Sequence, residues 1–432
     1  MDRAVEGKRS LRGEIMVPGD KSISHRALML ASLADGESVL RGLSTSRDVG
    51  STFGALESIG VDMERNGDRV RVRGEGISGF ELKGKDPAVE VDCGNSGTTA
   101  RLLTGLLAGA RIRARLFGDS SLSKRPMMRV IDPFSRFGAR IEHNDGRLPI
   151  LLLGGRLRNL RYIVPVPSAQ VKTALLLASI FVEGTSMVDE TVLTRDHTER
   201  MFSSMNAALV QTPLRRGKRM TVTGRMPLFP LDLKIPGDIS TAIFYIVSAL
   251  VTPGSRLVVR DVGLNPTRSY ILEVLKRMGA RIEIEHTETD PEPCGTIVVE
   301  SSSLRGVAVG GEEISLLIDE LPALACAALF AEGETTVRDA GELRVKESDR
   351  IRAVVDMVRS FGGEAEGRDD GFSVWGPSDI RSTAVRSCGD HRIAMAASIL
   401  ALAAEGKSLV RGADCVAVSC PEFFDLLDKI AT

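Results

Sequence analysis

The stretch Met16-Val-Pro-Gly-Asp-Lys-Ser-Ile-Ser-His-Arg26 runs from an extended segment through a Pro-Gly turn into an apolar run. We predict a helix from Ile23 to Ala34, because the Asp and Ser residues around its start can cap its amino end. Lys21 and Arg26 lie in or beside its first turn. A helix N-terminus is already partly positive, so cations there indicate a bound anion. The simpler interpretation is a solvated turn with two surface charges.

This pattern of a polar start followed by an Ala/Leu-rich run returns five more times along the chain. The six runs begin near Ser24, Gly97, Ser168, Asp238, Glu320 and Asp390, between 70 and 82 residues apart. A helix that is apolar on all sides must be buried on all sides. Each run is followed by a β-rich segment and then by a more polar helix. The sequence therefore predicts six copies of one mixed strand–helix unit.

The period does not fit the common solenoid repeats, so we expect two compact α/β domains of three units each. The phrase Val17-Pro-Gly-Asp20 recurs as Ile235-Pro-Gly-Asp238, which indicates a domain boundary there. We predict one domain at 20–235 and a second made of 1–19 with 236–432. The two crossings near Pro18 and Pro236 would then form a hinge.

The bulk composition is that of a soluble globular protein, with 432 residues, 43% hydrophobic and 26% charged. Fifty-six basic and fifty-seven acidic residues leave a net charge of −1, which argues against a general nucleic-acid or anionic-membrane surface. The six cysteines form no CxxC pair, and no signal region or membrane-spanning run is present. We expect a cytoplasmic protein.

Polar residues at the starts of the apolar runs are the candidate ligand-binding groups. If parallel helices direct their N-termini at a gap between the domains, their dipoles favour anions there. Ordinary capping accounts for Asp238 and Ser240, but it does not account for the cations. Two charged loops add to these groups, at 120–126 and 343–350, and a third unit carries a related loop at 194–200. In the second loop, Lys346 and Arg350 would share a face if the segment were helical.

Seven motifs in order then make the chain recognisable. They are ProGlyAspLysSerIleSerHisArg (18–26), GlyAsnSerGlyThr (94–98), LysArgPro (124–126), ProSerAlaGln (167–170), AspGluLeuPro (319–322), ArgValLysGluSerAspArg (344–350) and AspHisArg (390–392). Over essentially its whole length the chain resembles the 5-enolpyruvylshikimate-3-phosphate synthase family of enolpyruvyl transferases. The resemblance implies a two-domain inside-out α/β barrel of β-α-β-α-β-β units with buried parallel helices.

The resemblance also implies an activity. Members of the family transfer the enolpyruvyl group of phosphoenolpyruvate to the 5-hydroxyl of 3-phosphoshikimate and release phosphate, in the shikimate pathway of aromatic amino-acid biosynthesis. The reaction passes through a tetrahedral intermediate, so it needs a base and an acid. It uses no metal or organic cofactor. The family is also the target of glyphosate, which occupies the phosphoenolpyruvate site beside Gly97.

Site residues carry over from the matching motifs. The expected catalytic residues are Asp319 as the base, Glu347 as the acid, Lys346 beside the 5-hydroxyl, and Lys21. Asp319 and Lys346 are also expected to contact the substrate. The residues expected on 3-phosphoshikimate are Lys21, which also reaches phosphoenolpyruvate, with Ser22, Arg26, Ser168, Gln170 and, more weakly, Thr194. Those expected around phosphoenolpyruvate are Gly97, Arg125, Gln170, Arg350 and Arg392.

The chain departs from the family pattern at three positions. Ala169 stands where many members have a second Ser, Glu342 replaces a frequent Asn, and Val418 to Pro421 occupy the region of a C-terminal Lys. Lys172 or Arg200 are candidates to compensate for the missing groups.

Two rival functions stay open. One is the enolpyruvyl transferase that acts on UDP-N-acetylglucosamine, many members of which carry a Cys in the loop where this chain has none between Phe117 and Met127. The other is a non-catalytic anion-binding protein, which would not need an acid and a base. We expect a monomer that binds small molecules, with no nucleic-acid or membrane partner.

Overall fold

The computed structural model describes residues 1–7, 10–84, 88–288 and 290–431. The chain divides into two compact units, one made of 1–18 with 236–432 and the other of 19–235. Each unit has its own cluster of buried hydrophobic side chains. Each unit therefore buries its apolar residues within itself.

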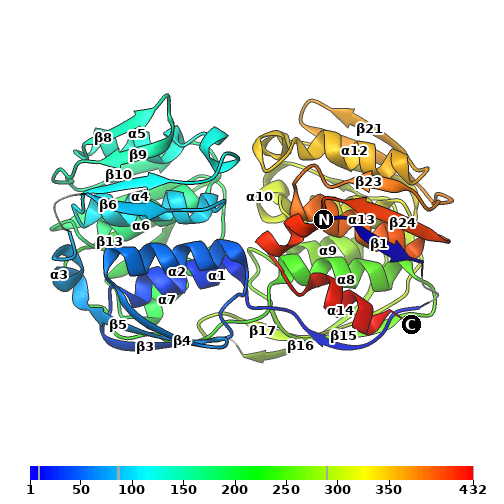
Figure 1. Ribbon diagram of the computed structural model, residues 1–432, viewed down its shortest axis with the longest axis horizontal. Coiled ribbons are helices and arrows are strands. Elements are labelled where there is room, and N and C mark those ends of the chain that lie inside the picture. The colour runs from blue at the N-terminus through cyan, green and yellow to red at the C-terminus, as the bar shows by residue number, and fades with distance from the viewer. Residues whose placement is uncertain (8–9, 85–87, 289, 432) are drawn as a thin grey trace. The chain divides into compact units, whose positions relative to one another are not determined.

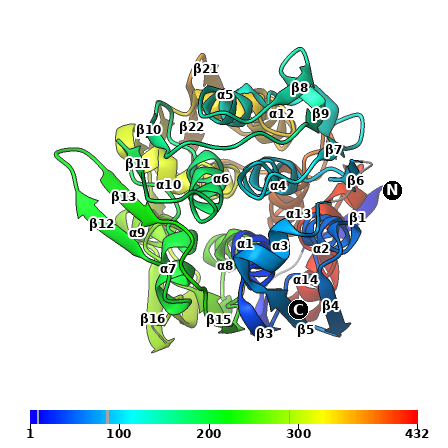
Figure 2. The ribbon, with the colours of Figure 1, turned by 90° about the vertical axis from the view of Figure 1, so that its left-hand side faces the viewer.

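In the 19–235 unit, apolar helices lie inside and sheets lie outside. Figure 1 shows the inner helices running side by side, and Figure 2 shows them end-on with the strands around them. The inner helices are α1 (Lys21–Ala31), α4 (Gly97–Gly109) and α6 (Ala169–Ser179). The outer helices are α2 (Arg47–Ile59), α3 (Gly76–Glu81), α5 (Met128–Arg136) and α7 (His197–Ser204).

The strands of this unit form separate mixed sheets. The first contains β14 (Asp232–Lys234), β3 (Asp35–Arg41), β5 (Arg69–Glu75) and β4 (Asp62–Asn66) in that spatial order. The second contains β6 (Val89–Asp92), β7 (Ala114–Phe117), β9 (Arg147–Leu152) and β8 (Ile141–Asn144). The third contains β10 (Arg161–Val164), β11 (Thr185–Glu190), β13 (Lys218–Thr223) and β12 (Leu209–Pro213).

Close packing fixes the register of α4 against α6. A Cβ at Gly105 would lie 2.3 Å from the carbonyl oxygen of Ala174, so only glycine lets these backbones approach so closely. Nearer their starts, the Gln170 side chain donates to the Thr98 hydroxyl at 3.0 Å. The helices are therefore parallel, and their N-termini lie at the same end.

The other unit repeats this plan. Its inner helices are α8 (Ile239–Val251), α11 (Leu321–Ala328) and α13 (His391–Ala403), and its outer ones are α9 (Tyr270–Arg277), α10 (Ile314–Leu317), α12 (Arg350–Ser360) and α14 (Phe423–Ile430). One sheet contains β2 (Arg12–Met16), β15 (Arg256–Gly263), β17 (Cys294–Glu300) and β16 (Arg281–Glu288). Another contains β18 (Leu304–Arg305), β19 (Ala308–Val309), β20 (Ala331–Val337), β22 (Gly371–Gly376) and β21 (Glu364–Arg368), and the last contains β1 (Arg3–Glu6), β24 (Lys407–Arg411) and β23 (Ala384–Arg386).

The same pairing rule holds in every sheet. The strand that follows an inner helix pairs in parallel with one neighbour and antiparallel with the other, as β7 does with β6 and β9. The parallel neighbour of β3 is β14, from the end of the 19–235 unit. The parallel neighbour of β15 is β2, from the start of the chain. The chain therefore passes from one unit to the other directly after β2 and directly after β14, each of which is an edge strand of its sheet.

The predicted α/β fold of repeated units with buried parallel helices is confirmed, and some boundaries need correction. The first helix begins at Lys21 rather than Ile23, because Asp20 is the residue that caps it, and it ends at Ala31 rather than Ala34. A 3-10 helix covers Gly341–Val345, but Lys346 is extended and α12 begins only at Arg350, so the stretch from 346 to 349 is not helical. Lys346 and Arg350 are therefore not neighbours on one helix face.

Candidate active site in two parts

The start of α1 carries the first group of predicted site residues. The Asp20 carboxylate accepts from the Ile23 amide at 2.9 Å and so fixes the helix start. Lys21 lies in the first turn and pairs with Asp48 of α2 at 3.0 Å. Arg26 is buried and donates to the Ser22 carbonyl at 2.8 Å. These contacts hold two cations at an end of the helix where its own dipole is positive.

The Arg26 guanidinium is also tied to the neighbouring helices. Its Nε donates to the Thr173 hydroxyl of α6 at 3.2 Å and to the Thr198 hydroxyl of α7 at 3.1 Å. These two hydroxyls bond to each other at 2.9 Å. The cation is thus oriented by neutral hydroxyl groups, which leave its positive charge in place.

Arg195 is a residue that the sequence interpretation passed over. Its Nη1 donates to the Ser22 hydroxyl at 2.9 Å, so it adds another guanidinium to the start of α1. Its neighbour Thr194 was the predicted ligand, but that side chain is buried and donates to Glu190 at 2.7 Å. The charge within the 194–200 loop was the signal that could have pointed to Arg195.

The starts of α4 and α6 bring together the remaining predicted residues of this unit. Ser168 caps α6 by accepting from the Val171 amide at 3.3 Å. Gln170 accepts from Arg101 at 3.0 Å through its Oε1. Arg125 donates to Asn95 at 3.0 Å. A Cβ at Gly97 would lie 2.7 Å from Arg101 Nη1 and 3.4 Å from Arg125 Nη1, so the glycine keeps the space beside both guanidinium groups open.

Buried His25 lies behind this surface. Its Nδ1 bonds to the Thr52 hydroxyl at 2.6 Å, and Thr52 bonds to Thr99 at 2.6 Å. Burial, followed by the charges of Lys21 and Arg26, holds the pKa of His25 well below its usual value. His25 is therefore neutral at physiological pH and joins α1 to α2 and α4.

In the other unit, Arg350 is the centre of a charged cluster. It is buried, and its guanidinium reaches Asp390 at 2.8 Å, Asp319 at 3.2 Å and Glu347 at 2.6 Å. Burial opposes its charge, but the three carboxylates outweigh burial and raise its pKa. Burial would likewise raise the pKa of Asp390, but the attraction of Arg350 outweighs it and the pKa is lowered. One guanidinium therefore fixes the expected base and the expected acid together.

Asp319 is surrounded by the other predicted cations of this unit. Its Oδ1 lies 3.9 Å from Lys346 Nζ, and its Oδ2 lies 3.7 Å from Arg392 Nη2. Arg392 also donates to the Asp319 carbonyl at 2.7 Å, while its buried Nε has no partner among the described residues. The cluster brings together Asp319, Lys346, Glu347, Arg350 and Arg392, as the motifs predicted.

The two residues suggested as compensation for missing groups are engaged elsewhere. Lys172 is completely buried between Glu190 and Glu199, at 2.9 and 2.8 Å, so a ligand cannot reach it. Arg200 pairs with Asp196 at 3.0 Å. For Lys172 the suggestion was wrong, because neighbouring carboxylates that are distant in sequence enclose the ammonium group.

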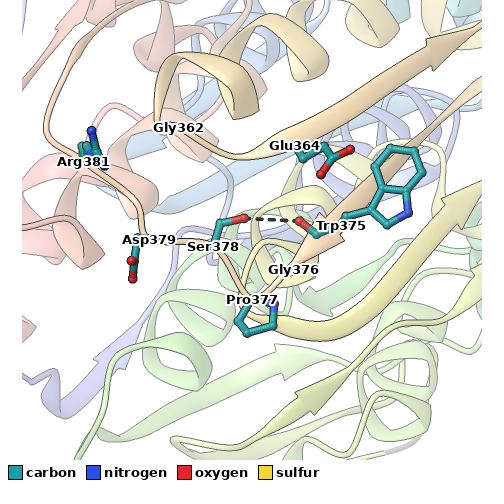
Figure 3. A pocket seen from close by; sticks show the side chains of 8 residues that line it. All are labelled: Gly362, Glu364, Trp375, Gly376, Pro377, Ser378, Asp379 and Arg381. Carbon is teal, nitrogen blue, oxygen red and sulfur yellow. Dashed lines mark hydrogen bonds between the residues drawn. The ribbon is translucent and has the colours of Figure 1, made fainter.

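A hollow of about 510 Å³ lies apart from these residues, at β21 and β22 (Figure 3). Its lining includes Trp375, Pro377, Glu364 and Arg381, and none of the predicted site residues contributes. The hollow is therefore not part of the candidate active site. Within the described parts of the chain, no helix is long and apolar enough to cross a membrane.

Comparison with solved structures defines the class of protein. The structure superposes on the enolpyruvyl transferase NikO from Streptomyces tendae with a TM-score of 0.76 over 99% of this chain and 96% of that one, at 18% identity. That likeness shows a shared fold. EPSP synthase from Acinetobacter baumannii superposes with a TM-score of 0.87 at 35% identity, over 100% of this chain and 98% of that one. Fold and site together place the chain among the enolpyruvyl transferases.

Comparison with sequences gives the family. The family model for EPSP synthase (3-phosphoshikimate 1-carboxyvinyltransferase) matches residues 5–427. A 3-phosphoshikimate 1-carboxyvinyltransferase from Pelotomaculum thermopropionicum is 47% identical over 100% of this chain and 99% of its own length. One from Bacillus cereus is 43% identical over 98% and 97%. The chain belongs to the EPSP synthase family, which confirms the predicted family and its class of transferase.

Proposed function

We propose that this chain transfers the enolpyruvyl group of phosphoenolpyruvate to the 5-hydroxyl of 3-phosphoshikimate and releases phosphate. Family membership supports the reaction. The observation that carries it in this chain is the Arg350 cluster, which holds Asp319 and Glu347 at 3.2 and 2.6 Å from one guanidinium. A protein that only bound anions would have no need of two carboxylates beside its cations.

The proton transfers assign a role to each carboxylate. Asp319 accepts the proton of the 5-hydroxyl as its oxygen adds to C2 of phosphoenolpyruvate, and Glu347 donates a proton to C3. The resulting tetrahedral intermediate then loses phosphate and a methyl proton, which restores the double bond. Lys346 lies 3.9 Å from Asp319 and would sit beside the same 5-hydroxyl.

Cations account for binding of the substrates, each of which carries a phosphate and a carboxylate. Lys21, Ser22 and Arg26 bind 3-phosphoshikimate, with Ser168 and Gln170 at the start of the parallel helix α6. Arg195 joins them, because its contact with Ser22 at 2.9 Å puts it where a phosphate would bind. A guanidinium there compensates for the hydroxyl that Ala169 lacks, since Arg donates to phosphate in a bidentate manner.

The remaining predicted site residues bind phosphoenolpyruvate. Gly97 and Arg125 lie at the start of α4, with Gln170 beside them, and Lys21 contributes a second cation. Arg392 has a buried Nε–H that makes no hydrogen bond among the described residues, and this group can donate to phosphoenolpyruvate. Arg350 has five N–H donors, and four of them bond to carboxylates. The fifth, on Nη1, can donate to the ligand. The main role of Arg350 is therefore to orient the acid and the base.

A phosphate-release assay with each acceptor tests the proposal. Phosphate should appear only when 3-phosphoshikimate and phosphoenolpyruvate are both present. Turnover of phosphoenolpyruvate with UDP-N-acetylglucosamine alone would assign the chain to the sister reaction. Tight binding of both substrates without any turnover would instead support the non-catalytic alternative. A cytoplasmic location and a monomeric state stay predictions.

A further inference from the structure

Lys172 of α6 is a buried cation that the mechanism does not use. Its side chain is 0% exposed, and it lies 2.9 Å from Glu190 of β11 and 2.8 Å from Glu199 of α7. Lys172 is the one ionic partner of the Glu199 carboxylate among the described residues. Burial lowers and the two carboxylates raise the pKa of Lys172, and the carboxylates prevail. The group is thus a buried triad of one ammonium and two carboxylate groups.

The triad holds Thr194 by all its polar atoms. Lys172 Nζ lies 3.4 Å from the Thr194 carbonyl oxygen, so its third N–H points to this residue. Glu190 accepts from the Thr194 amide at 3.2 Å and from its hydroxyl at 2.7 Å. No rotation of Thr194 is possible without breaking one of these bonds. The residue directly before Arg195 is therefore fixed to the core.

The other end of the same segment is fixed by the next residue of α6. Thr173 bonds to the Thr198 hydroxyl at 2.9 Å, and both hydroxyls accept from Arg26. Lys172 and Thr173 thus anchor residues 194–199 on both sides of Arg195. From this position Arg195 reaches Ser22 at 2.9 Å.

We propose that Lys172 is a positioning residue, which acts through Thr194 to set the Arg195 guanidinium for the phosphate of 3-phosphoshikimate. This inference rests on the proposed function. Stability alone does not account for the triad, because well-packed apolar residues in place of a buried ion pair are often neutral or stabilising. A fixed arginine, by contrast, binds phosphate with less loss of side-chain entropy than a mobile one.

The test is a double-mutant cycle between Lys172→Met and Arg195→Ala, with Michaelis constants measured for each substrate. Wild-type turnover of 3-phosphoshikimate and phosphoenolpyruvate is measured first, because its absence would refute the proposed function separately. Each single variant should raise KM for 3-phosphoshikimate about tenfold to a hundredfold, the range for one charge-assisted hydrogen bond. KM for phosphoenolpyruvate should change by less than about twofold. In the Arg195→Ala background, Lys172→Met should have no further effect on KM.

Lys83→Met is the matched control. Lys83 has a side chain that is 10% exposed, and it donates to Glu75 at 3.1 Å and to the Gly60 carbonyl at 2.8 Å, both outside the 194–199 segment. This variant should lose stability without any change in KM. If Lys172→Met fails to fold because it leaves the Glu199 carboxylate without a counter-charge, a second variant is used. The variant Lys172→Met/Glu199→Gln, which also removes the Glu199 charge, then takes the place of Lys172→Met in the cycle.

Two results would overturn the proposal. One is an equal rise in KM on mutating Lys172 with and without Arg195, which would mean that Lys172 acts by another route. The other is an unchanged KM in the Arg195→Ala single variant, which would remove Arg195 from the phosphate site.

Discussion

Gly97→Ala perturbs the proposed phosphoenolpyruvate site by one methyl group. The new Cβ would lie 2.7 Å from Arg101 Nη1, closer than such atoms approach, so the flexible Arg101 guanidinium must move. Arg101 donates to Gln170 at 3.0 Å and to the Pro126 carbonyl at 3.1 Å. A net hydrogen bond contributes about 1 kcal/mol, so restoring the displaced Arg101 arrangement when phosphoenolpyruvate binds would cost about 2 kcal/mol, or roughly 30-fold in affinity.

Steady-state phosphate release measures this effect. KM for phosphoenolpyruvate should rise by roughly 10-fold to 30-fold, while KM for 3-phosphoshikimate changes by less than about threefold. The inhibition constant for glyphosate should rise as well, because the methyl group enters the space that glyphosate shares with phosphoenolpyruvate in this family. Michaelis and inhibition constants equal to those of the wild type would refute the steric argument.

Gly54→Ala is the control for the glycine change itself. Gly54 is an exposed residue of α2, and a Cβ there would meet nothing within 4 Å. This variant should gain about 0.5–1 kcal/mol of stability from the lower entropy of its unfolded chain and should keep its kinetic constants.

Three further predictions concern the base, the central arginine and the buried histidine. Asp319→Ala should keep substrate binding by calorimetry but lower kcat by roughly a hundredfold or more, and an unchanged kcat would remove Asp319 as the base. Arg350→Met should lower the free energy of unfolding in urea by about 3–5 kcal/mol, since it leaves buried carboxylates without their cation; a loss below about 1 kcal/mol would contradict this. Below the usual pKa of 6.5, His25 is protonated in the unfolded chain but stays neutral in the folded protein. The wild type should therefore lose stability relative to His25→Gln as the pH is lowered below 6.5. The difference should reach up to about 1.4 kcal/mol per pH unit, and parallel stability curves for the two proteins would argue against a neutral buried His25.

Local signals explain why the helix starts could be predicted from the sequence. A cap acts over two or three residues, so Asp20, Ser168 and Asp390 identify their helices without knowledge of the fold. The apolar character of the runs indicated burial, and their period indicated the repeated unit. The motif resemblance then supplied the family, which sequence comparison confirms.

Contacts between distant segments explain what the sequence did not reveal. Lys172 looks like a candidate ligand in the sequence, and only the approach of β11 and α7 shows that two carboxylates enclose it. Arg350 likewise looks like a ligand cation, whereas Asp390, 40 residues away, binds it within the core. The resemblance implies Thr194 as a ligand, but its side chain turns to Glu190 while Arg195 reaches Ser22, and nothing local in the sequence shows this difference.

A crystal structure with 3-phosphoshikimate and glyphosate bound tests the central claim most directly. The phosphate of 3-phosphoshikimate should lie on Ser22, Arg26 and Arg195, its 5-hydroxyl should lie within hydrogen-bond distance of Asp319, and glyphosate should lie beside Gly97 and Arg125. Ligand phosphates bound away from the starts of α1, α4 and α6, or a 5-hydroxyl out of reach of Asp319, would contradict that claim.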